Sequence, residues 1–189
     1  MKNKIFIISG PSGVGKKTII DSFINDDALN LSYSISMTTR QPRLGEQNAK
    51  DYYFVSHDDF QKAIENDEMV EWAEFCSNKY GTKKSEIKRI IDSNKSVLLE
   101  IEIQGALKVF KKFNRDEYVS IFIAPPSIKE LKKRLKNRST ENKKICKQRI
   151  KTAKLELPIQ KEYDYVVIND NLQECINQIV KIIKEAQSE

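Results

Sequence analysis

The feature that most constrains this chain is a glycine-rich segment, GPSGVGK at residues 10–16, placed directly after a short apolar run at 4–9. Behind it come apolar residues at helical spacing: Ile19, Ile20, Phe23 and Ile24. A strand, a tight glycine loop ending in lysine and a helix form the arrangement of a phosphate-binding loop, or P-loop, whose backbone N–H groups face phosphate oxygens. The pattern predicts a nucleotide site, and a glycine-rich turn with an incidental lysine is the alternative.

The residue after Lys16 departs from this loop pattern. A Ser or Thr hydroxyl there helps to hold Mg²⁺, whereas this chain has Lys17. An ammonium group has no lone pair to give a metal. We expect Mg²⁺ to be held through water, phosphate oxygens and a carboxylate, with the Lys17 side chain directed to solvent or to a phosphate. Loss of the metal is the alternative.

Composition excludes several other classes of protein. The 189 residues suit one domain, and 39% hydrophobic residues are enough for a folded core. Three widely spaced cysteines and one histidine, His57, argue against zinc ribbons, disulfide scaffolds and His-rich metal sites. No apolar run is long enough for a signal sequence or a membrane span, so we expect a soluble, cytoplasmic protein.

Apolar runs alternate with helical patterns along most of the chain. Strands are predicted at 4–9, 96–101, 118–124 and 165–168, with a further alternating strand at 33–37. Helical stripes comprise Ile87, Ile90 and Ile91, and then Cys175, Ile176, Ile179, Val180 and Ile183. Ser127 and Glu130 form a capping box, which predicts a helix start. This rhythm predicts an α/β fold with a parallel sheet covered on both faces, interrupted by an insertion at about 38–80.

A second anion site is predicted in the insertion. Arg40 and Arg43 flank a proline and form a rigid fork suited to a phosphate, with a tyrosine hydroxyl nearby as a neutral donor. The alternative is that these arginines only pair with Glu46 and Asp51 on the surface.

In the phosphate loop, in the arginine fork and along the rest of its length, the chain closely resembles guanylate kinases, which phosphorylate GMP from ATP. The matching stretches run in order through the chain: GPSGVGK (10–16), SISMTTRQPRLGE (34–46), KDYYFVS (50–56), EWAEF (71–75), KYGT (79–82), LEIEIQGA (99–106), FIAPPS (122–127), LKKRLKNRSTE (131–141) and VVIND (166–170). The resemblance implies a three-layer P-loop fold in a single domain, 1–189. Its parts would be a core (1–35, 83–125 and 158–189), a GMP-binding insertion (about 36–82) and a helical lid (about 126–157).

The resemblance also implies how GMP is bound. The implied GMP-binding residues are Ser36, Arg40, Arg43, Glu46, Tyr52, Glu71, Tyr80, Thr82 and Glu102. The two arginines and two tyrosines would grip the phosphate, while the Glu71 carboxylate would accept the N1–H and N2–H₂ donors of guanine. Thr82 would donate to O6. At Glu102 the family usually has Asp, so a longer side chain would reach guanosine or a Mg²⁺-bound water here.

The implied ATP-binding residues are Gly10, Pro11, Ser12, Gly13, Val14, Gly15, Lys16, Lys17, Thr18, Asn169 and Asp170. Catalysis would rest on Lys16 and on the lid arginines Arg134, Arg138 and Arg149, by positioning and charge neutralisation. Glu100 would reach the metal through water, or would act as a structural partner of an arginine. Asn169 would contact adenine, a turn residue being its alternative, and Ser139 replaces the family's glycine before the lid helix.

The sequence therefore predicts a Mg²⁺-dependent kinase with ATP and GMP, and also dGMP, as substrates. We expect a monomer or weak dimer without nucleic-acid or membrane partners. One alternative is a catalytically weak module of this fold that binds phosphorylated peptides. Another is a nucleic-acid binder that uses the basic stretch at 129–151, although this stretch lacks the interleaved aromatic residues of such proteins and also suits a solvated helix face.

Overall fold

The computed structural model describes residues 3–75, 77–136 and 143–188. A five-stranded sheet forms the core in the order β2-β7-β1-β8-β9, and every neighbouring pair is parallel. Its strands are β1 (Ile5–Ser9), β2 (Leu31–Tyr33), β7 (Ser96–Glu100), β8 (Tyr118–Ala124) and β9 (Tyr165–Ile168). The predicted α/β class with a central parallel sheet is confirmed.

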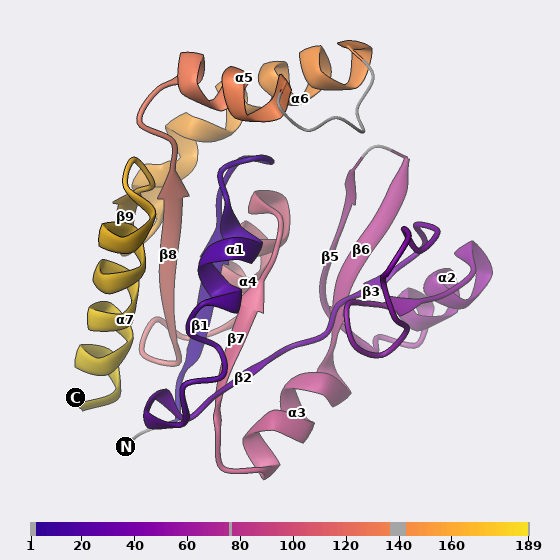
Figure 1. The fold of residues 1–189 in the computed structure, drawn as a ribbon. Coiled ribbons are helices and arrows are strands. Elements are labelled where there is room, and N and C mark those ends of the chain that lie inside the picture. Colours follow the sequence, from indigo (N-terminus) through magenta and orange to yellow (C-terminus); the bar gives the residue numbers. More distant parts are fainter. Residues whose placement is uncertain (1–2, 76, 137–142, 189) are drawn as a thin grey trace.

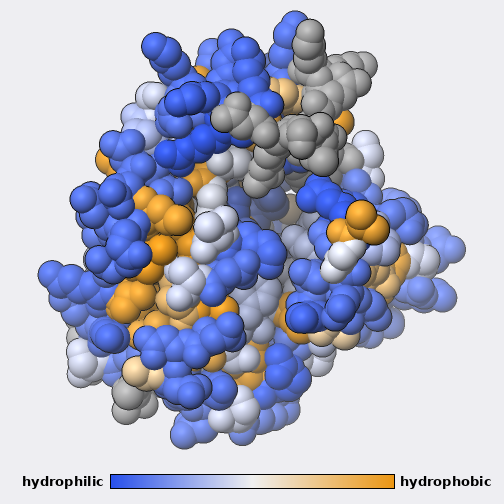
Figure 2. Space-filling view, viewed as in Figure 1, coloured by the Kyte–Doolittle hydropathy of each residue, from blue (hydrophilic) through white to orange (hydrophobic). Residues whose placement is uncertain are grey.

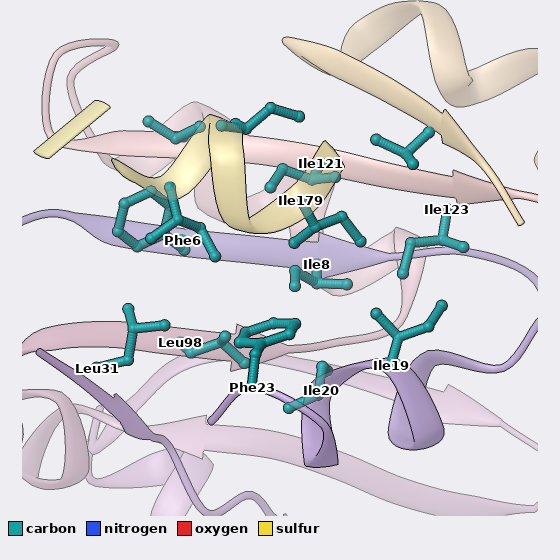
Figure 3. Close-up of a cluster of buried hydrophobic side chains, with 14 of the residues drawn as sticks. Phe6, Ile8, Ile19, Ile20, Phe23, Leu31, Leu98, Ile121, Ile123 and Ile179 are labelled. Atoms are coloured by element: carbon teal, nitrogen blue, oxygen red, sulfur yellow. The ribbon is translucent and has the colours of Figure 1, made fainter. Parts of the chain in front are cut away.

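Helices cover both faces of this sheet because the central strands are apolar on both sides. Phe6 and Ile8 of β1 point to α1 (Lys16–Asp21) and α7 (Leu172–Ser188), as Figure 3 shows. Ile5 and Ile7 point the other way, to α3 (Lys84–Asp92) and α4 (Ile103–Lys112). Two short 3₁₀ helices, Asp27–Leu29 and Leu157–Glu162, complete the core.

The insertion forms a second sheet that stands beside the core (Figure 1). Its strand order is β4-β3-β6-β5, with β3 (Met37–Thr38), β4 (Tyr53–Phe54), β5 (Met69–Phe75) and β6 (Asn78–Lys83). Helix α2 (His57–Glu65) packs on it through the buried Phe60 and Ala63. The chain enters this sheet from β2 and returns to the core through α3.

The lid segment consists of α5 (Ile128–Lys136) and α6 (Lys143–Glu156), which pack together through Leu131, Leu135 and Ala153. Figure 1 shows the two helices crossing above the core and the second sheet. The predicted cap is confirmed, since the Ser127 hydroxyl accepts the Glu130 N–H at 3.1 Å.

Four details of the sequence prediction were wrong. Residues 33–37 do not form one strand, because the chain leaves the core sheet after Tyr33 and joins the second sheet at Met37. Strand β6 was not predicted. Helix α1 ends at Asp21, so the stripe of apolar residues continues into a turn, and Ile91 of α3 is exposed.

Among residues 3–75, 77–136 and 143–188, no helix combines the length and apolar character needed to cross a bilayer.

Candidate active site

A cleft of about 1220 Å³ separates the core from the second sheet, with α6 on its third side. Figure 2 shows the molecule hollowed at this place. The predicted residues that line it are Ser12, Gly13, Gly15, Lys16, Lys17, Thr18, Ser36, Arg40, Arg43, Glu46, Tyr52, Glu71, Tyr80, Glu100, Glu102 and Arg149. The predicted phosphate loop and the predicted GMP-binding residues therefore face one another across a single space.

Some predicted residues lie outside this lining. Gly10, Pro11, Val14, Thr82, Arg134, Asn169 and Asp170 do not border the cleft in the described part of the chain. Arg138 and Ser139 lie outside the described residues.

The phosphate loop is held in shape from the last core strand. Gly15 has a φ of 105°, and a Cβ there would lie 2.8 Å from the Asn169 Nδ2. That nitrogen donates to the Val14 carbonyl at 2.7 Å. The Lys16 ammonium donates to the Gly10 carbonyl at 2.7 Å, within the same loop. Asn169 thus supports the loop, and its adenine contact stays a prediction.

Lys17 points away from the loop interior. Its side chain is 73% exposed and its ammonium lies 3.3 Å from Asp21, one helical turn onward. This agrees with the expected direction to solvent. The position after Lys16 therefore offers neither a metal ligand nor a buried positive charge.

On the opposite wall, Arg40 is fixed by several neighbours. Its Nη2 lies 2.8 Å from the Glu46 carboxylate, and its guanidinium lies over the rings of Tyr52 at 5.4 Å and Phe54 at 5.7 Å. The other Glu46 oxygen accepts the Arg43 N–H at 2.7 Å. Arg40 does pair with Glu46, as the alternative expected, but both side chains are largely buried and line the cleft. Glu46 therefore fixes the position of the arginine at the cleft.

Two tyrosine hydroxyls stand next to this arginine as neutral donors. The rings of Tyr52 and Tyr80 meet edge to face with centroids 6.1 Å apart. Burial raises the pKa of both hydroxyls, that of Tyr52 far above its ordinary value, so both groups keep their protons at neutral pH. The wall can donate hydrogen bonds and positive charge to a phosphate.

Glu71 lies deeper in the same wall and is almost fully buried. Burial raises the pKa of its carboxyl to about 7, against the opposing hydrogen bond from Thr82 and the charge of Lys108. The Thr82 hydroxyl donates to Glu71 Oε1 at 2.9 Å and does not face the cleft. The predicted donation from Thr82 to guanine O6 therefore does not match this arrangement, because the single hydroxyl proton is already used.

The family model described as guanylate kinase matches residues 2–186. The chain belongs to the guanylate kinase family. It is 57% identical over 184 residues to the guanylate kinase of Malacoplasma penetrans, covering 97% of the chain and 94% of that relative.

Two further comparisons extend this guanylate kinase assignment. The chain is 43% identical over 182 residues to the guanylate kinase of Mesoplasma florum, covering 96% of the chain and 61% of that relative. The crystal structure of guanylate kinase from Anaplasma phagocytophilum superposes with a TM-score of 0.79 at 34% identity, covering 99% of this chain and 87% of that one.

In this guanylate kinase chain, the lid brings one of the predicted arginines to the cleft. Arg149 of α6 lines it and donates to the Ser12 hydroxyl of the phosphate loop. Arg134 of α5 instead contacts Glu130 at 3.4 Å, within its own helix.

Sequence reasoning missed two residues near the guanylate kinase phosphate loop. The Tyr33 hydroxyl donates to Glu100 at 3.2 Å, and burial raises the pKa of both groups. Burial also raises the pKa of Glu156 to about 7, with Glu102 adding to this shift and Lys16 opposing it. Tyr33 fitted a strand pattern and Glu156 fitted a helix pattern. Neither residue therefore had neighbours in the sequence that indicate a place near the phosphate loop.

Proposed function

We propose that this chain transfers the terminal phosphoryl group of ATP to GMP, producing ADP and GDP. The observation that carries this proposal is the single cleft with Lys16 on one wall and Arg40 and Glu71 on the other. Such a cleft suits two nucleotides whose phosphates meet in the middle.

On the donor side, the loop at residues 10–16 would hold the ATP phosphates by its backbone N–H groups. Lys16 would leave the Gly10 carbonyl and follow the phosphoryl group as it moves. We propose that Arg149, with Arg134 and Arg138, neutralises the charge that the transferring group spreads over its oxygens.

On the acceptor side, Arg40 would bind the GMP phosphate with Arg43, Tyr52 and Tyr80. The ionised Glu71 carboxylate would accept the adjacent N1–H and N2–H₂ donors of guanine, a pair that adenine does not offer. A site that hydrogen-bonds a substrate edge can reject the wrong base by about 10⁴-fold. The pair of walls would therefore select GMP, and we propose that dGMP is accepted also.

Mg²⁺ fits the donor set beside the loop. Mg²⁺ in proteins is held by one or two carboxylates together with substrate phosphates and water. Glu100 lies at the carboxyl end of β7 and lines the cleft, with Tyr33 orienting its carboxylate. In the described residues, no group of three or more acidic, histidine or cysteine side chains could hold a metal alone. Bound Mg²⁺ would supply charge neutralisation of the phosphates.

The proposal also covers the oligomeric state, the location and the partners of the enzyme. We expect a monomer or weak dimer that acts in the cytoplasm on small-molecule substrates, without a nucleic-acid or membrane partner.

A panel of acceptors tests the proposed function. GMP, dGMP, AMP, UMP and CMP would each be offered with ATP and Mg²⁺, and ADP release measured in a coupled assay. Turnover with GMP and dGMP alone is the expected result. Absence of turnover with every acceptor would overturn the proposal, and GMP binding without turnover would indicate the catalytically weak binding module.

A further inference from the structure

One face of helix α4 lies against the strand that carries Glu71. Gly105, Lys108 and Lys112 share this face, because they are three and four residues apart. The Lys112 ammonium donates to the Val70 carbonyl at 2.7 Å, and the Lys108 ammonium donates to the Trp72 carbonyl. These two carbonyls belong to the neighbours of Glu71 on either side. The core helix thus holds the β5 backbone immediately before and after the carboxylate.

Gly105 makes room for the Glu71 side chain itself. A Cβ at position 105 would lie 2.3 Å from Glu71 Oε2 and 3.0 Å from its Cδ. Glycine weakens a helix relative to alanine, so its presence in the first turn of α4 needs a spatial reason. The carboxylate of Glu71 provides that reason, since it occupies the space of the missing methyl group.

Lys108 adds a positive charge on the same side. Its ammonium lies 4.3 Å from the centre of the Trp72 ring, and its charge lowers the pKa of Glu71 against the effect of burial. Glu102 at the start of α4 acts in the opposite direction, and Thr82 holds the other carboxylate oxygen from β6. Glu71 is therefore held between Thr82 and the α4 face.

We propose that Gly105, Lys108 and Lys112 are positioning residues that set the place of the Glu71 carboxylate and thereby contribute to the choice of the purine base. This inference rests on the proposed role of Glu71 in reading guanine. Guanine presents two adjacent N–H donors and hypoxanthine presents only N1–H, so an accurately placed carboxylate favours GMP over IMP. A displaced carboxylate accepts one donor well and loses that preference.

The first test is Gly105→Ala, which favours the helix and displaces only the end of the Glu71 side chain. We expect kcat/KM for GMP to fall about tenfold, mainly through KM, as one charge-assisted hydrogen bond is lost. The value for IMP should change less, so the GMP to IMP ratio should fall. Thermal unfolding of the ligand-free variant should not begin at a lower temperature.

A double-mutant cycle shows whether Gly105 acts through Glu71. The Glu71→Gln variant no longer accepts the hydrogen bond from the guanine N2–H₂ group. Adding Gly105→Ala to it should therefore cause little further loss of kcat/KM for GMP. Additive losses would overturn the inference.

Lys108→Met provides a second variant that keeps the aliphatic stem and removes the charge. It should lower the GMP to IMP ratio, whereas the matched change Lys111→Met, at an exposed position on the same helix, should leave the ratio unchanged.

The results separate the two proposals. Unchanged GMP to IMP ratios in both Gly105→Ala and Lys108→Met would overturn the inference about α4. Equal losses for GMP and IMP together with earlier unfolding would also overturn it, because the role would then be structural. Unchanged GMP kinetics in Glu71→Gln would instead overturn the proposed reading of the base.

Discussion

At the scale of single residues, Glu71 is the group in which burial opposes the proposed function most directly. Burial raises the pKa of its carboxyl to about 7 in the ligand-free molecule. Two N–H donors from a bound guanine would favour the ionised form and draw the pKa down again. Binding of GMP is therefore expected to release a proton near neutral pH.

This coupling predicts a pH dependence of catalysis. The value of kcat/KM for GMP should rise about tenfold between pH 6 and pH 8, as the ionised fraction of Glu71 increases. The GMP phosphate also titrates near pH 6. Glu71→Gln serves as the control for that titration, and the rise beyond the phosphate effect should disappear in this variant. The same pH profile in both proteins would contradict the prediction.

The Glu71 carboxyl also predicts that the stability of the folded protein falls as the pH rises, whereas kcat/KM rises. Its folded-state pKa of about 7 lies above the ordinary value of 4.5, so the folded protein holds an extra proton between these values. Stability that depends on this proton is lost as the pH rises through that range, by at most about 3 kcal/mol. Urea unfolding of the ligand-free protein at pH 5 and pH 8 should show a smaller loss in Glu71→Gln than in the native chain.

Lys17 predicts a change in metal dependence. Lys17→Ser would place a hydroxyl where the loop pattern supplies a Mg²⁺ ligand, so activity should saturate at a lower Mg²⁺ concentration. Lys17→Met removes the charge without adding a ligand and serves as the control. The same Mg²⁺ titration for Lys17→Ser and the native chain would count against the prediction.

At the scale of secondary-structure elements, helix α3 fastens the second sheet to the core through Glu86. This buried carboxylate accepts the Ile35 N–H at 3.1 Å and the Tyr53 hydroxyl at 3.4 Å, and Arg89 reaches both of its oxygens at 3.0 Å and 2.8 Å. Burial would raise the pKa of Glu86, but these hydrogen bonds and the Arg89 charge lower it. Ile35 lies in the segment that connects the two sheets, so Glu86 holds this connecting segment in place.

Glu86→Gln should therefore loosen the second sheet. We expect a loss of stability of about 1–3 kcal/mol, because a charged hydrogen-bond acceptor is removed from a buried network. KM for GMP should rise while KM for ATP stays nearly constant, since the phosphate loop lies on the other wall. Asp92→Asn, at an exposed position on the same helix, is the matched control. An equal rise of both KM values would argue against a local effect.

Elements whose signal is local could be predicted from the sequence. The phosphate loop and the cap of α5 depend on residues that are neighbours in the chain, and both lie where the sequence indicated. Strand β6 was missed because its residues, NKYGTK, show no apolar alternation and are held by pairing with β5. The break at 33–37 was missed because the pattern of side chains does not show which sheet a strand joins.

The candidate site divides in the same way. Arg40 was predicted from the fork that it forms with Arg43, and Tyr52 and Glu71 were predicted because the resemblance marks them. The contacts of Glu71 with Gly105 and Lys108 join segments more than thirty residues apart in sequence. Such contacts depend on how α4 packs on β5, which the sequence pattern of neither element reveals.

At the scale of the whole molecule, we propose that the two walls of the cleft, whose volume is about 1220 Å³, approach each other before a phosphoryl group passes between them. Closure also protects the group from water. A ligand that binds only the folded state stabilises that state, by about 2.7 kcal/mol when the ligand concentration is a hundred times its dissociation constant.

A closing cleft predicts that the two ligands act together. GMP with a non-hydrolysable ATP analogue should raise the unfolding temperature by more than the sum of the separate shifts, and small-angle scattering should show a smaller radius of gyration with both bound. Gly105→Ala should reduce the GMP contribution only. Additive shifts with an unchanged radius would contradict closure.

The second sheet has one further consequence. The chain leaves the core at the end of β2 and returns through α3 to β7, and these two strands are neighbours in the core sheet. Every residue that we propose to bind the acceptor phosphate therefore lies in a segment attached at one edge of the core, and the core strands β2 and β7 pair directly with each other. Replacement of this one inserted segment could therefore change the phosphate acceptor during evolution, while the core sheet and the phosphate loop stay the same.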